Sequence, residues 1–310
     1  MRSFASILLL APPLAVSLLA PNVECQLLAS EPGTVSQTVD GTKVTVTYYR
    51  PRARGRTGLF GTRIKWGDTW TPGANMATRL DVSKDVTIEG QQVPKGAYSV
   101  WIVVTRGNWE MLLDHDTTLF HTQGPKQRAG QVRFQVSREK KPFMETLTWW
   151  VPEMSGTGMT LAMQWDTVYV PLRIKVPPSY TTVVAAPVAR RVVGTYQLHL
   201  EPMPEPPKDT TVHEESEKPP TDVRFTIRHE AGELRAVMDP PMYVTEPGYT
   251  DWLLLPRSSG WYRIGRMHQG ELVEIFDFFT LEFDAGGDRA KSFEIRLPND
   301  ALAGKGTRVP

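Results

Sequence analysis

Four arginines lie two residues apart near the start of the chain: Arg50, Arg52, Arg54 and Arg56. The guanidinium group presents a planar fork of N–H donors that matches a carboxylate or a phosphate. Alternate residues of an extended chain share one side, which would bring the four side chains together. Because Pro51 and Gly55 break regular strand geometry, two interpretations stay open: an anion-binding site, or a solvated loop between strands.

A second group of candidates combines two tryptophans with an amide. Trp66, Trp70 and Asn75 lie close in sequence, and Pro72-Gly73 between them is typical of a type II turn. If exposed, they would form a platform for a sugar ring or an apolar ligand. Alternatively, the tryptophans fill the core and Asn75 bonds to the backbone of its own loop. The candidate ligand-binding residues are therefore Arg50, Trp66, Trp70, Asn75 and Thr78.

Metal and catalytic chemistry have weaker signals. Asp114-His115-Asp116 with His121 superficially resembles a metal cluster, but one loop supplies every ligand, so we expect a polar turn. The sequence has no HExxH, no GxSxG and no phosphate-cradling loop. We therefore predict no catalytic residue, no metal ligand and no cofactor. A catalytic pair drawn from distant positions stays open.

The first 25 residues have the pattern of a secretory signal peptide: one positive charge, then an apolar run over residues 4–20. A spanning helix needs about 20 apolar residues, and Pro12-Pro13 interrupts this run, which disfavours an uncleaved anchor. Cleavage after Ala20 and after Cys25 are both open, and Glu24 disfavours lipidation of Cys25. Because Cys25 is the only cysteine, we expect a mature chain without disulfides. We expect a periplasmic or secreted protein, with no transmembrane segment after removal of the signal.

Short alternating runs predict that the elements carrying these candidates are strands. Val44, Val46 and Tyr48 alternate with polar residues, and Asp40-Gly41 just before them is a turn signal. Eight to ten such runs occur between residues 27 and 176, and no segment of ten residues has a helical period. This pattern is typical of an antiparallel β-sandwich.

The second half of the chain reads as a separate domain. Residues 177–192, which start at Pro177-Pro178, are predicted to be a linker, and residues 193–310 hold about eight runs in up-and-down order. That order predicts a small, lipocalin-like β-barrel. Residues 201–222 have six prolines and seven acidic residues, so we expect a disordered loop.

The net charge differs between the two halves of the chain. Residues 27–178 carry 19 Lys and Arg against 13 Asp and Glu, and residues 179–310 carry 15 against 20. This difference fits two domains with separate surfaces. It is too mild to imply nucleic acid, which an exported protein would seldom meet.

Several short motifs resemble a known family. They are Tyr48-x-Arg50-Pro51, Gly55-Arg56, Phe60-Gly61, Trp66-Gly67-x-x-Trp70, Gly73-Ala74-Asn75-x-Ala77-Thr78, Asp85-Val86 and Gly96-x-Tyr98-Ser99. Over residues 35–175 the chain is similar to the domain of unknown function 2911 family. The resemblance implies an exported β-rich domain with no assigned activity. The chain departs from the family pattern at Thr71, where arginine is usual; if that arginine binds a ligand, the resemblance implies weaker binding here.

Two functions follow as hypotheses. The first is an exported, non-catalytic binding or interaction protein of the cell envelope, with a small molecule, a glycan, a lipid or an envelope protein as its partner. The alternative is an extracytoplasmic hydrolase or lyase with a site near Arg50 and Asn75.

Overall fold

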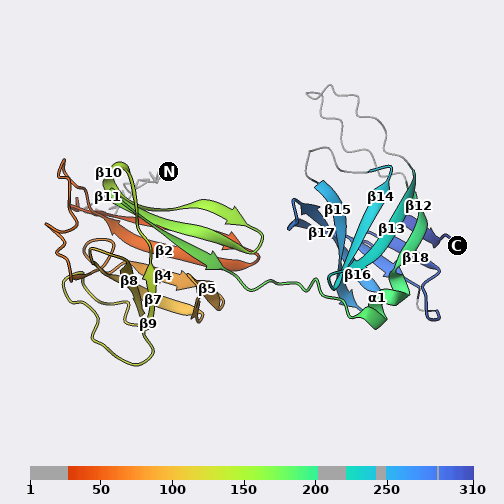
Figure 1. Cartoon of the computed structure of the whole chain (residues 1–310), viewed down its shortest axis with the longest axis horizontal. Coiled ribbons are helices and arrows are strands. Elements are labelled where there is room, and N and C mark those ends of the chain that lie inside the picture. Colours follow the sequence, from red (N-terminus) through yellow and green to blue (C-terminus); the bar gives the residue numbers. More distant parts are fainter. Residues whose placement is uncertain (1–26, 202–220, 242–248, 285) are drawn as a thin grey trace, which may run out of the picture.

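The part of the chain that the structure describes is all-β apart from one short helix, as the sequence predicts (Figure 1). The computed structural model describes residues 27–201, 221–241, 249–284 and 286–310. The predicted signal peptide, residues 1–25, lies outside the described residues. So do residues 202–220 of the predicted disordered loop. Among the residues described, the structure has no helix of the length and apolar character needed to cross a membrane.

The first domain is a sandwich of two sheets. The larger sheet has the strand order β1-β2-β4-β7-β8-β9, with β3 also paired to β7. Its strands are β1 (Glu31–Val39), β2 (Thr42–Arg50), β3 (Thr69–Trp70), β4 (Arg79–Val82), β7 (Gly96–Val103), β8 (Trp109–Asp114) and β9 (Val132–Val136). The smaller sheet, in the order β10-β11-β5-β6, holds β10 (Glu139–Ser155), β11 (Gly158–Lys175), β5 (Val86–Ile88) and β6 (Gln91–Val93).

Alternating side chains bury one face of each sheet against the other. In β2, Val44, Val46 and Tyr48 are buried, and the residues between them are more exposed, because successive side chains point to opposite faces. Leu147 and Trp149 of β10 join the same core, and the Trp149 backbone N–H donates to the Tyr48 hydroxyl at 3.0 Å. The two sheets therefore share one core.

The second domain is a closed, eight-stranded, antiparallel barrel in which strands that follow each other in sequence are neighbours. Its strands are β12 (Gly194–Leu200), β13 (Asp222–Glu230), β14 (Glu233–Asp239), β15 (Tyr249–Ser258), β16 (Trp261–His268), β17 (Glu271–Phe283), β18 (Ser292–Arg296) and β19 (Leu302–Arg308). The barrel closes because β12 pairs with β13 on one side and with β19 on the other. This confirms the predicted up-and-down barrel.

The predicted linker 177–192 is wrong over its second half. Val184 is buried in the barrel core, and residues Ala186–Val192 form the helix α1, which buries Ala189 and Val192 there. Burial of these small apolar side chains makes the segment part of the barrel. Sequence reasoning missed α1 because seven residues are too few to show a helical period.

The connection between the two domains is short and contacts both of them. The Ser179 backbone N–H donates to the Asp40 carboxylate at 2.5 Å, at the β1–β2 turn. Tyr180 packs against Leu253, Leu255 and Met267 of the barrel. Figure 1 shows the sandwich and the barrel as separate bodies joined at this point.

Candidate functional site

Arg50 is built into the structure between the two sheets. It ends β2, and its guanidinium donates to the Leu147 carbonyl at 3.4 Å and to the Thr148 hydroxyl at 3.0 Å, both in β10. Its aliphatic part lies against Gly33, where a Cβ would come within 2.9 Å of the Arg50 Cδ. The geometry therefore gives Arg50 a role in joining the sheets.

The chain after β2 forms a long loop, residues 51–68, that two carboxylates hold in place. Glu145 accepts the backbone N–H groups of Arg54 at 2.7 Å and Gly55 at 3.2 Å. Asp166, which is buried, accepts the backbone N–H of Leu59 at 2.8 Å. Both acids thus bind backbone groups of the loop. The charged side chains of the loop are exposed to solvent.

The four arginines of the 50–56 run do not share one side. Arg50 points between the sheets, while the Arg56 guanidinium turns back onto the Ala53 carbonyl at 2.7 Å. Arg52 lies 3.8 Å from the Glu145 carboxylate. Only Arg54 makes no side-chain hydrogen bond or ion pair with another described residue. The doubt raised by Pro51 and Gly55 is thus confirmed.

Trp66 is half-buried at the end of this loop, between a glycine and an arginine. A Cβ on Gly61 would lie 2.6 Å from three atoms of the indole, so only glycine fits against that ring. The Arg106 guanidinium carbon lies 5.6 Å from the ring centroid, within the range of a cation–π contact. Trp66 therefore supports an exposed guanidinium, a different role from that of an open platform for a sugar.

Trp70 lies at the edge of the core. Its ring stacks on Trp165 with centroids 6.1 Å apart and planes at 16°, and Phe60 contacts it edge-on at 5.4 Å. This aromatic cluster packs the end of β3 against β11 and the 51–68 loop. Like Trp66, Trp70 is only partly buried.

Thr71 and Thr78 are fully buried and fix the turn between β3 and β4. The Thr71 hydroxyl donates to the Val100 carbonyl at 2.8 Å and accepts the Thr78 backbone N–H at 2.9 Å. The Thr78 hydroxyl donates to the Pro72 carbonyl at 2.9 Å. Thr71, the departure from the family pattern, therefore has a defined structural partner on each side.

Asn75 binds segments outside its own turn. It has a positive φ of 54°, which asparagine tolerates better than most residues. Its side-chain amide donates to the Ser30 carbonyl at 3.2 Å, and its own carbonyl accepts the backbone N–H of His121 at 2.8 Å. Asn75 thus joins the residue just before β1 to the loop after β8.

In the Asp114 region, a buried carboxylate forms an ion pair with an exposed guanidinium. Asp114 is fully buried, and its carboxylate pairs with Arg128 and accepts the Gln131 amide at 2.6 Å. Burial alone would raise the pKa of Asp114, but the bonds from Arg128, Gln131 and the Asp116 backbone hold that pKa below its ordinary value. Among the described residues, no group of three or more His, Cys, Asp or Glu side chains is placed to hold a metal ion.

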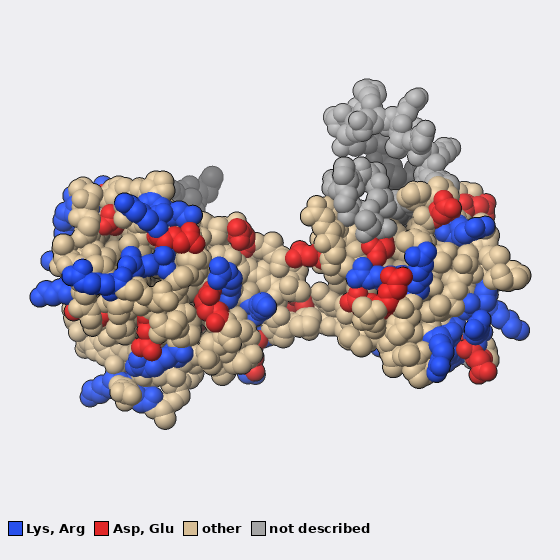
Figure 2. Space-filling view, in the orientation of Figure 1, with Lys and Arg blue, Asp and Glu red and all other residues tan. Residues whose placement is uncertain are grey.

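The feature that sequence reasoning missed is a basic surface built on the 51–68 loop. We define it by Arg54, Arg63, Lys65 and Arg106, whose side chains are exposed and form no hydrogen bond or ion pair with the rest of the described chain. In Figure 2, several Lys and Arg side chains protrude at the end of the sandwich farthest from the barrel. Arg106 joins this surface only through the fold, since 40 residues separate it from Trp66.

Comparison with known protein families gives a match for the first domain only. Residues 30–174 match the model of a family described as "Protein of unknown function (DUF2911)". No curated protein matches the chain. No solved structure matches it either.

Proposed function

Because residues 30–174 belong to the DUF2911 family, whose description assigns no activity, we propose a function from the geometry of this chain. The protein is an exported, non-catalytic binding protein of the cell envelope. Its first domain binds an acidic glycan through the basic surface of Arg54, Arg63, Lys65 and Arg106. The proposal rests chiefly on one observation: these four exposed cations have no carboxylate partner among the described residues.

The chemistry of the surface favours an anionic ligand. Guanidinium groups bind carboxylates and sulfates through paired N–H donors. Trp66 holds the Arg106 guanidinium over its ring, which lowers the entropy lost when that side chain binds. Glu145 and Asp166 fix the loop backbone from below, so the cations are presented from a supported loop.

The form of the surface favours an extended polymer. The cations lie along an exposed loop, so a chain carrying repeated negative charges can contact several of them at once. Insertion into a lipid bilayer needs exposed apolar side chains. Residues 51–68 contain none of the large exposed hydrophobic side chains of the described chain. A uronic-acid polysaccharide therefore fits better than a lipid surface.

A binding assay with matched charge variants tests the proposal. The chain from residue 27 onward is titrated with polygalacturonate, with neutral dextran and with phosphatidylglycerol vesicles. We expect binding to polygalacturonate that weakens with salt. The variant R54Q/R63Q/K65Q should bind about tenfold more weakly, since each exposed charge contact contributes about 0.2–1 kcal/mol.

The control removes the same number of charges from the barrel. R224Q/R228Q/K305Q changes three exposed cations there and should leave the affinity unchanged. Equal binding of polygalacturonate by the loop variant and the wild type would refute the proposal, and so would equal binding of dextran. Binding to the vesicles alone would show that the ligand of the basic surface is a lipid and not a glycan.

The enzyme alternative places its site near Arg50 and Asn75. Arg50 and Asn75 each donate to groups of the protein itself, at 3.0 Å to the Thr148 hydroxyl and at 3.2 Å to the Ser30 carbonyl. Incubation with polygalacturonate, followed by measurement of new reducing ends, tests this alternative directly. We expect none above the rate without protein.

A further inference from the structure

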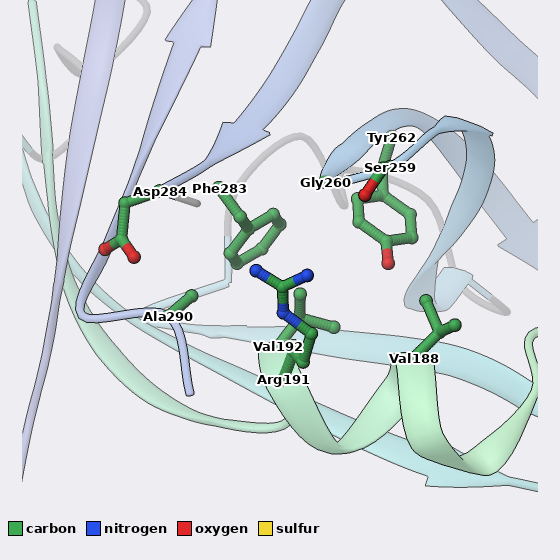
Figure 3. A pocket seen from close by; sticks show the side chains of 9 residues that line it. All are labelled: Val188, Arg191, Val192, Ser259, Gly260, Tyr262, Phe283, Asp284 and Ala290. Atoms are coloured by element: carbon green, nitrogen blue, oxygen red, sulfur yellow. The ribbon is translucent and has the colours of Figure 1, made fainter. Parts of the chain in front are cut away.

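The barrel has a groove of its own beside α1, on a different domain from the basic surface. Two adjoining hollows share Arg191, and Figure 3 shows the inner one. The inner hollow has a volume of about 60 Å³ and lies between α1 and the barrel residues Tyr262 and Phe283. The outer one has a volume of about 490 Å³ and is lined by Pro187, Arg190, Arg191, Gly287, Asp288 and Arg289.

Hydrogen bonds join the described parts of the groove walls to one another. Asp284 accepts the backbone N–H groups of Lys291 at 2.7 Å and Ser292 at 2.6 Å, which ties down the chain after β17. The Ala290 backbone N–H donates to the Arg191 carbonyl at 2.8 Å, which joins this chain to α1. The Arg308 guanidinium then binds the carbonyls of Ala290 and Val193 at 2.5 and 2.8 Å.

The polar groups that face the groove are mainly donors. Arg190 and Arg289 are exposed and form no side-chain bond with the rest of the described chain. Figure 3 shows the Tyr262 hydroxyl pointing into the inner hollow, near the Arg191 guanidinium. Burial raises the pKa of Tyr262, and nearby Arg191 opposes that rise only in part, so the phenol keeps its proton at neutral pH.

Two acidic side chains, Asp284 and Asp288, line the two hollows of the groove. In Figure 3 the Asp284 carboxylate points away from Tyr262; its Oδ2 accepts the backbone N–H groups of Lys291 and Ser292, and its Oδ1 is buried with no hydrogen-bond partner among the described residues. Asp288 lines the outer hollow together with Arg190 and Arg289, whose side chains form no bond with the rest of the described chain. Arginine forks beside a phenolic O–H match the acceptor oxygens of a carboxylate or a phosphate.

We infer that this groove binds a small molecule bearing an oxyanion, a carboxylate or a phosphate, between Arg190, Arg289 and Tyr262. The inner hollow, at about 60 Å³, has room for a group of a few atoms and not for a whole ring system. The rest of the ligand therefore lies in the outer hollow. A free metabolite and a phospholipid headgroup present the same chemistry.

Titration of the chain from residue 27 onward with inorganic phosphate, with citrate and with phosphatidylglycerol vesicles tests the inference. We expect R190Q/R289Q to weaken binding of the best of these probes by about tenfold, which corresponds to about 1.4 kcal/mol. Both side chains are exposed, so the fold should be unaffected. Y262F should weaken binding severalfold. The control R224Q, at an exposed position of β13, should leave the affinity unchanged.

Two results would overturn the inference: no binding of any probe at millimolar concentration in low salt, or equal binding by R190Q/R289Q and the wild type. Binding of phosphate or citrate that the double variant weakens supports a free small ligand. Vesicle binding weakened in the same way, without binding of the free anions, supports a headgroup. The loop variant R54Q/R63Q/K65Q should keep this binding, which separates the two sites.

Discussion

Replacing Thr71 by valine should destabilise the sandwich without touching its surface. Thr71 is fully buried, and its hydroxyl donates to the Val100 carbonyl and accepts the Thr78 backbone N–H. Valine has nearly the same shape, so no cavity forms, but both backbone groups lose this partner. An unpaired buried polar group costs about 1–3 kcal/mol, so we expect a loss of roughly 2–4 kcal/mol. That is a large part of the usual 5–15 kcal/mol of a domain.

Urea unfolding followed by tryptophan fluorescence measures this loss. Seven of the nine tryptophans lie in residues 27–176, so the signal reports mainly on the sandwich. The control Thr47→Val makes the same chemical change at an exposed position of β2, and should stay within about 0.5 kcal/mol of wild type. If Thr71→Val is as stable as Thr47→Val, the two hydrogen bonds of the Thr71 hydroxyl do not stabilise the sandwich. If it is stable but binds polygalacturonate poorly, Thr71 belongs to the site.

Three further results follow from the same contacts. Asp114→Asn should destabilise the sandwich at pH 7; because the folded pKa of Asp114 is lowered, the difference from wild type is fully present above about pH 4 and shrinks as pH falls further, which urea unfolding at pH 7, 5 and 3 measures. Gly61→Ala should weaken polygalacturonate binding, because φ is 96° there and the new Cβ would meet the Trp66 ring; unchanged affinity would contradict the role given to Trp66. Arg308→Met should lower the melting temperature of the barrel, because the carbonyls of Ala290 and Val193 lose a bound guanidinium; calorimetry showing no shift would contradict this.

Alternation of side chains was enough to predict the strands with one buried face, such as β2. It failed where apolar residues do not follow the alternation. β1 is polar and mostly exposed along Glu31–Val39, so it shows no apolar run. Asp166 and Asp277 interrupt the apolar patterns of β11 and β17. The sequence pattern therefore predicts two strands in place of each. In the structure each is one continuous strand, and Asp166 adopts a positive φ of 55° within β11.

The candidate site shows the same limit. The sequence singled out residues of unusual type, and four of them, Arg50, Trp70, Asn75 and Thr78, bond to or pack against the protein itself. The basic surface depends on which cations lack partners, and that requires the fold. Trp66 was found from sequence, but its partner Arg106 was not, because no local pattern links residues 40 positions apart.

Hydrogen–deuterium exchange of the wild-type chain, with and without polygalacturonate, tests the central claim most directly. Bound glycan should slow exchange in peptides that cover residues 51–68 and 104–108, and leave the barrel strands β12 to β19 unchanged. Slower exchange confined to the barrel, or none anywhere at saturating glycan, would contradict the assignment of the binding surface to the sandwich.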